Sequence, residues 1–102
     1  MTQNFLPEKE YTIPGTSLRV ILRAWSMFQI EQAKARGVAE GDKYDGTNDL
    51  WGQVLNVTGR EPVWPSAKAM KDALSLGQMV AISQELLALT QGGVDLAAFR
   101  AP

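Results

Sequence analysis

The chain has 102 residues, a length that fits one domain with one modest hydrophobic core. Its residues are 45% hydrophobic and 21% charged, as in ordinary globular proteins, and a formal net charge of −1 argues against duplex nucleic acid and anionic membranes as partners. Cysteine and histidine are both absent, which excludes disulfides and thiolate chemistry and removes the commonest general base and metal ligand.

The sequence shows no pattern that is typical of catalysis or of cofactor binding. It contains neither of the two glycine-rich motifs that bind phosphates, GxGxxG and GxxxxGK[ST]. Ser66 and Lys68 lack the SxxK spacing of a serine nucleophile with its lysine, and the acidic residues within 40–49 do not match a calcium loop. The first eleven residues do not resemble a secretory signal, and no apolar run approaches the ~20 residues of a membrane helix. We therefore expect a cytoplasmic protein without cofactor or metal, which is not an enzyme and acts by binding other proteins.

The first predicted element is a β-hairpin that pairs residues 10–13 with residues 18–24. Pro14 and Gly15 supply its turn, and residues 18–24 alternate apolar and polar side chains with a period of two. A helix competes for residues 18–24, because their apolar side chains also fit a helical stripe. The Ser-x-x-Gln capping pattern at 26–29 favours the strand, since a helix that begins at Ser26 requires a different element before it.

Four helices are predicted to follow the hairpin, and serine caps mark three of their starts. Ser26 and Ser75 each precede a glutamine by three residues, which is the capping-box spacing, and Ser66 is a simple N-cap. Glycines and prolines mark the ends and the connections between helices. The expected helices are 27–36, 48–57, 67–74 and 76–91, with a loop at 37–46 and an extended connector at 60–65.

These elements predict a mainly α fold with a short N-terminal β-hairpin and about four helices, which is a small α+β domain. The single globular domain is expected to cover residues 10–93. Residues 1–9 are interpreted as a flexible lead-in, and residues 94–102 as a mobile tail.

The fourth predicted helix is apolar on two stripes. Met79, Ile82, Leu86 and Leu89 form the first stripe, and Leu76, Val80 and Leu87 form the second. Either the helix is packed on both sides, or the second stripe belongs to an interface with a subunit or partner. As the second helix of a helix-turn-helix it would suit DNA badly, because residues 76–89 contain no Lys or Arg to contact phosphates or guanine.

Three tryptophans are many for a chain of this length. Trp25 is interpreted as a core residue, whereas Trp64, between Val63 and Pro65, is either buried or an anchor for a partner. A small core need not absorb every large apolar side chain. The candidate protein-binding residues are therefore Trp51, Trp64, Leu87, Leu96 and Phe99.

The order of these segments resembles a known family. A strand pair in YTIPGTSLRVILRAWS leads into a helix in MFQIEQAKARG. A short apolar helix in DLWGQVLNVTG, a REPVWPS connector and a closing helix in ALSLGQMVAISQELLALTQG follow. This layout, over roughly residues 8–93, resembles the tail assembly chaperones of long-tailed bacteriophages. The chain departs from that family in its glycine-rich loop at 37–46 and in its short segment after Gly93.

The resemblance implies a non-enzymatic protein of the host bacterial cytoplasm. Such chaperones coat the tape-measure protein, recruit tail-tube subunits, self-associate in rings or spirals, and leave before the tail is complete. Partners would then be the tape-measure and tail-tube proteins, with no nucleic acid, membrane or cofactor. The alternatives are another phage structural adaptor, such as a head–tail connector, and a small helix-turn-helix DNA-binding regulator.

Overall fold

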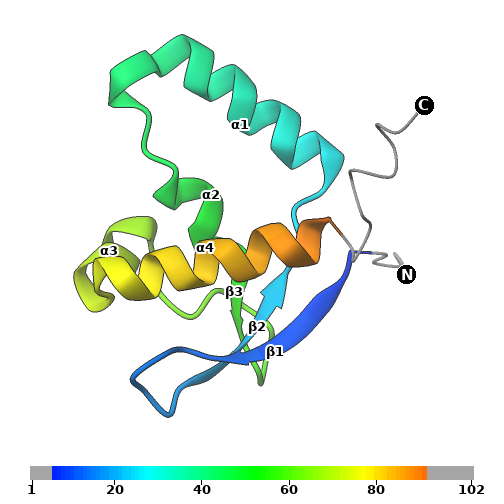
Figure 1. Ribbon diagram of the computed structural model, residues 1–102, viewed down its shortest axis with the longest axis vertical. Coiled ribbons are helices and arrows are strands. Elements are labelled where there is room, and N and C mark those ends of the chain that lie inside the picture. The colour runs from blue at the N-terminus through cyan, green and yellow to red at the C-terminus, as the bar shows by residue number, and fades with distance from the viewer. Residues whose placement is uncertain (1–5, 92–102) are drawn as a thin grey trace.

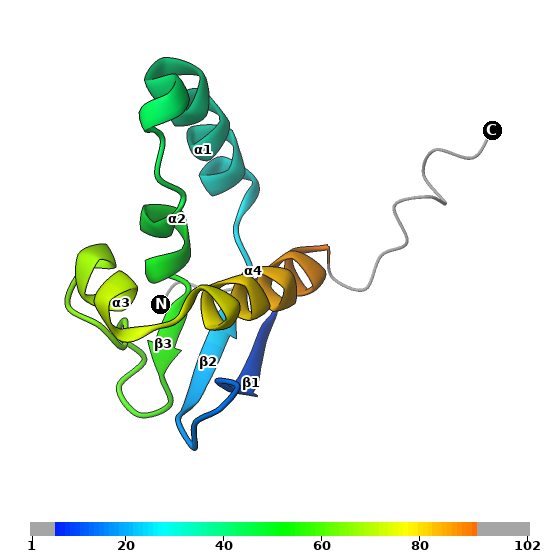
Figure 2. The ribbon, with the colours of Figure 1, turned by 60° about the vertical axis from the view of Figure 1, so that its left-hand side comes forward.

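A three-stranded antiparallel sheet in the order β1-β2-β3 forms one side of the molecule, and α4 crosses one of its faces (Figures 1 and 2). The computed structural model describes residues 6–91. The predicted fold class, mainly α with an N-terminal β-hairpin, is confirmed for this part of the chain. In chain order the elements are β1 (Glu8–Thr12), β2 (Arg19–Arg23), α1 (Met27–Glu40), the 3-10 turn η1 (Gly41–Lys43), α2 (Thr47–Trp51), β3 (Val54–Asn56), α3 (Ala67–Ala73) and α4 (Leu76–Thr90).

The hairpin forms as expected, and the strand interpretation of residues 18–24 is correct. Its turn is closed by hydrogen bonds from the Ile13 amide to the Leu18 carbonyl (3.0 Å) and from the Thr16 hydroxyl to the Ile13 carbonyl (2.8 Å). Gly15 takes φ = +78°, a conformation that costs glycine little. However, β1 begins at Glu8, inside the segment predicted as a flexible lead-in, because Glu8 pairs with Arg23 of β2 and the Ala24 amide donates to the Pro7 carbonyl at 2.9 Å.

The prediction of a helix over residues 48–57 is wrong in its second half. Only α2 is helical there, and Val54–Asn56 forms β3, in which Val54 lies opposite Leu22 of β2. The connector also pairs with β3, since the Val63 amide donates to the Val54 carbonyl at 3.0 Å. Strand pairing overrides the helical stripe because it buries Gln53, Val54 and Leu55 in succession, which one face of a helix cannot do.

The first helix is longer than predicted and takes up part of the predicted loop at 37–46. The capping box between Ser26 and Gln29 is present as expected. The prediction that Gly37 ends the helix is wrong, because Gly37 lies inside α1, where a glycine costs only about 1 kcal/mol. The helix ends instead at Gly41, which takes φ = +58° and donates its amide to the Gly37 carbonyl.

The core lies between the sheet and α4. Ile82 and Leu86 of α4 are fully buried, and Met79 and Leu89 pack against the core, so the first apolar stripe faces inward. The buried apolar cluster consists of Ile13, Val20, Leu22, Leu50, Val54, Met70, Ile82 and Leu86.

The helix caps predicted at Ser66 and Ser75 are both formed. No helix in residues 6–91 is both long enough and apolar enough to cross a membrane.

Candidate functional site

Helix α1 stands apart from the rest of the protein. Both ribbon views place it on the far side of α2 and α4 from the sheet (Figures 1 and 2), and none of its residues is buried. Its half-buried apolar residues, Ile30 and Ala33, are spaced along one helical face. A helix that buries so little needs other contacts to hold it in place.

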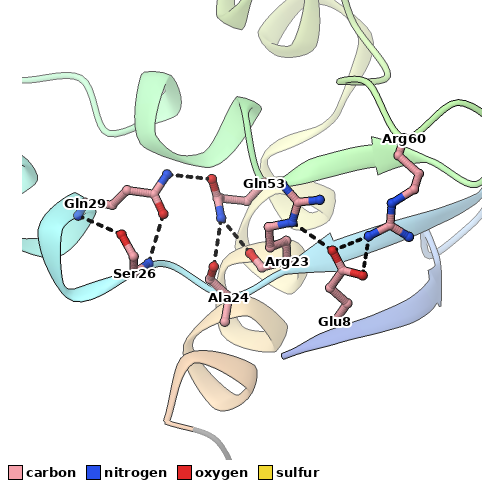
Figure 3. A network of polar contacts seen from close by, with 7 residues as sticks. All are labelled: Glu8, Arg23, Ala24, Ser26, Gln29, Gln53 and Arg60. Carbon is pink, nitrogen blue, oxygen red and sulfur yellow. Dashed lines mark hydrogen bonds and ion pairs between the residues drawn. The ribbon is translucent and has the colours of Figure 1, made fainter. Parts of the chain in front are cut away.

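The first of these contacts is a polar network centred on the buried side chain of Gln53 (Figure 3). The Gln53 side-chain amide donates to the carbonyls of Arg23 (2.7 Å) and Ala24 (3.0 Å). Its oxygen accepts a hydrogen bond from the side chain of Gln29 (3.1 Å), which also completes the capping box with Ser26. Gln53 therefore joins the first turn of α1 to the end of β2.

The second contact is made by Asp49 of α2. Its carboxylate accepts hydrogen bonds from the Arg36 guanidinium and the Tyr44 hydroxyl. Its backbone carbonyl accepts from the indole nitrogen of Trp25 at 2.8 Å. Asp49 thus fixes the later turns of α1, the loop before α2 and the indole of Trp25 in one arrangement.

Two cavities meet beside Trp25, and together they form what we call the Trp25 groove. The first, of about 600 Å³, lies between α2 and α4, and the second, of about 470 Å³, lies between α1 and α2; Trp25 and Gly46 line both. Most of the exposed lining is apolar, as is usual in binding sites. The further lining residues are Asp45, Thr47, Leu50, Lys71, Leu74, Leu76, Met79, Val80, Ser83 and Gln84 in the first cavity, and Gln29, Ile30, Ala33, Lys34, Gly37, Tyr44 and Asp49 in the second.

The second apolar stripe of α4 continues the groove onto the surface. Leu76 is 81% exposed, Val80 is 45% exposed and Leu87 is 54% exposed. Leu76 and Val80 also line the first cavity. Within the described residues α4 is therefore packed on its inner stripe alone, and the alternative of packing on both sides is wrong for these three side chains.

The predicted binding residues that the structure describes differ in their surroundings. Trp51 and Trp64 are half-buried against the core, and the Trp51 indole donates to the Trp64 carbonyl at 2.6 Å. Neither lines the two cavities of the Trp25 groove. Leu87 is exposed on α4, as a binding residue must be, whereas Leu96 and Phe99 lie outside the described residues.

Sequence reasoning missed the centre of the groove. Trp25 packs against core residues, as expected, but it also lines both cavities. The missed signal lies on α1, where Ile30, Ala33 and Gly37 recur at helical spacing beside a tryptophan. That pattern predicts an apolar face, although it does not show which element faces it.

An ion pair between Asp45 and Lys71 at 2.7 Å crosses the rim of the first cavity. The hydrogen bond from Lys71, with a further one from the Thr47 amide, lowers the pKa of Asp45 from 3.8 to about 2. A carboxyl whose pKa is lower in the folded state stabilises the fold above pH ~4 and loses that effect as the pH falls towards 2. Both side chains are about half exposed, so solvent screening limits the gain to less than about 1 kcal/mol.

We therefore expect Asp45→Asn to lower the free energy of unfolding slightly near neutral pH, by less than about 1 kcal/mol. The difference between variant and wild type should become much smaller at pH ~2, because about half of the Asp45 carboxyls are then protonated in the folded state. Urea denaturation at the two pH values measures it. A difference that stays the same at both values would show that the ion pair does not contribute in this way.

No group of three or more acidic residues within residues 6–91 is arranged to hold a metal ion. Comparisons of the chain with protein-family models, with curated proteins and with solved structures found no match. The resemblance to phage tail assembly chaperones therefore stays a prediction. The Trp25 groove and the adjoining stripe of α4 are the features from which a function can be argued.

Proposed function

We propose that this protein is a non-enzymatic phage tail assembly chaperone of the host bacterial cytoplasm. In this role it binds the tape-measure protein, recruits tail-tube subunits and is absent from the finished tail. The family role rests on the sequence resemblance. The observation that supports binding is the Trp25 groove, which is apolar, open to the surface and continuous with the exposed side chains of Leu76 and Val80.

The chemistry of the groove selects its ligand. Its cavities lie on the two sides of α2, against α4 and against α1, and Trp25 lines both, so the groove fits an apolar segment such as one face of an amphipathic helix. Cationic and anionic side chains lie at its rim, and Asp45 and Asp49 are already engaged by Lys71 and Arg36. Burial of apolar area then supplies most of the affinity.

The arrangement also suits a temporary complex. Polar contacts from Gln53 and Asp49 hold α1 in position before any ligand arrives, so little ordering is required on binding. The exposed apolar residues of α4 are few, and an interface of this kind is modest in area. Modest interfaces release their partners more readily than large obligate ones.

Val80→Glu tests this proposal, with Val57→Glu as its matched control. The two valines are similarly exposed, at 45% and 42%, but Val57 does not line either cavity of the groove. We expect Val80→Glu to weaken binding to the purified tape-measure protein by about tenfold or more, because a carboxylate is costly to bury without a partner. Val57→Glu should leave the affinity within about twofold.

Isothermal titration calorimetry gives both affinities directly. If the wild-type protein does not bind the tape-measure protein, the chaperone role is overturned. If it binds but both glutamate variants bind equally well, the assignment of the groove is overturned while the role survives.

A further inference from the structure

Gly46 lies where the two cavities of the Trp25 groove meet. Within residues 6–91, Gly46 and Trp25 are the two residues that line both cavities. Gly46 is also the N-cap of α2, the helix that has one cavity on each side. A side chain at this position would therefore stand where one cavity opens into the other.

The backbone does not require a glycine at this position. Gly46 has φ = −68° and ψ = −7°, a conformation that residues with a side chain adopt without strain. A Cβ atom added to Gly46 would lie 3.9 Å from Cε1 of Tyr44, an ordinary van der Waals contact, and would clash with no described residue. The effect of the glycine is therefore on the space around it, because the missing side chain leaves the two cavities connected.

One charged residue of the groove lining has no partner of opposite charge. Asp45 pairs with Lys71 at 2.7 Å, and Asp49 pairs with Arg36. Lys34 of α1 lines the second cavity and makes no ion pair with any residue in the described range 6–91. An acidic side chain on a bound segment would complement this charge.

We propose that one continuous apolar segment of the tape-measure protein crosses Gly46, fills both cavities and places an acidic residue beside Lys34. The inference rests on the proposed function, to which it adds the path of the bound segment and its charge. The glycine permits the close approach that the crossing requires. A single segment in both cavities buries more apolar area than a ligand confined to one, at one loss of translational freedom.

A leucine at position 46 tests the path, and Gly52→Leu is its matched control. Gly52 is the C-cap of the same helix with φ = −72° and ψ = −9°, an added Cβ there meets nothing within 4 Å, and Gly52 lines neither cavity of the groove. Measured by isothermal titration calorimetry, Gly46→Leu should weaken binding to the purified tape-measure protein by about tenfold or more, because leucine blocks the crossing. Gly52→Leu should leave the affinity within about twofold.

Thermal unfolding followed by circular dichroism separates this effect from damage to the fold. Both variants should unfold at the same temperature as the wild type or slightly above it, because replacing a glycine of compatible φ restricts the unfolded chain. A clearly lower unfolding temperature for Gly46→Leu than for Gly52→Leu would show that the space beside Gly46 is not open, and the proposal would be overturned.

Lys34→Glu tests the charge of the segment, with Lys43→Glu as its control. Both lysines are exposed and without an ion pair in the described part of the chain, but Lys43 does not line the groove. At low salt we expect Lys34→Glu to weaken binding by about fivefold more than Lys43→Glu, and high salt should reduce this difference. Equal effects of the two substitutions would overturn the acidic contact.

The outcomes distinguish this inference from the function on which it rests. A wild-type protein that does not bind the tape-measure protein overturns both. If the wild type binds and Val80→Glu weakens binding, but Gly46→Leu and Gly52→Leu bind equally well, this inference alone fails.

Discussion

Replacing Leu86 by alanine should lower the free energy of unfolding by about 3 kcal/mol, whereas the same change at Leu87 should alter it by less than about 0.5 kcal/mol. The two leucines are neighbours on α4, but Leu86 is fully buried in the core and Leu87 is 54% exposed. Truncating the buried side chain removes its transfer free energy and leaves a cavity. Truncating the exposed one removes little contact area.

Urea denaturation followed by tryptophan fluorescence measures both changes, because Trp25, Trp51 and Trp64 all pack against the core. The matched pair also separates stability from binding. Leu87→Ala should keep the fold and weaken client binding, since Leu87 belongs to the exposed stripe that continues the groove. Equal destabilisation by the two substitutions would mean that α4 is rotated relative to the sheet, and the assignment of its outer stripe would then be wrong.

Gln53→Leu should destabilise the protein by about 2–4 kcal/mol, although it places an apolar side chain in a buried position. The change leaves the carbonyls of Arg23 and Ala24 and the side-chain amide of Gln29 without the partner that Gln53 supplies. Each buried group left unsatisfied costs about 1–3 kcal/mol. Gln32→Leu, on an exposed position of α1, is the control and should change stability by less than about 0.5 kcal/mol.

The loss at Gln53 should also be local. Hydrogen exchange of the α1 amides should become faster than that of the α4 amides, because Gln53 holds the first turn of α1 whereas α4 is held by the buried side chains of Ile82 and Leu86. If α1 stays as protected as α4 in the variant, apolar contacts and not the polar network hold the helix in place.

Local signals in the sequence predict much of the fold. The capping boxes at Ser26 and Ser75 mark true helix starts, and the turn at Pro14 and Gly15 closes a true hairpin. These features depend on residues only a few positions apart. For that reason they can be recognised without knowledge of the tertiary structure.

The errors occur where distant residues decide the outcome. Residues 54–56 fit a helical stripe, but pairing with β2 makes them a strand. α1 continues through Gly37 because Arg36 is held by Asp49 of α2 and because Gly41 provides a better end. Neither the partner strand nor the distant carboxylate can be recognised from spacing along the chain.

The candidate site can be predicted only in part, for the same reason. The sequence shows two apolar stripes on α4, but only the position of the sheet determines that Ile82 and Leu86 face inward while Leu76 and Val80 face the groove. Tryptophan is frequent at protein interfaces, and this favours Trp51 and Trp64 as anchors for a partner. In the structure these indoles pack against the core, and Trp25 takes the place in the groove.

The three tryptophans provide the most direct measurement of whether the Trp25 groove is the binding surface. Each indole N–H gives its own NMR signal, and these signals can be followed while the tape-measure protein is added to the full chain. We predict that the Trp25 indole signal shifts or broadens, while the signals of Trp51 and Trp64 stay in place, since neither lines the two cavities. A complex in which Trp51 or Trp64 responds and Trp25 does not would contradict this assignment.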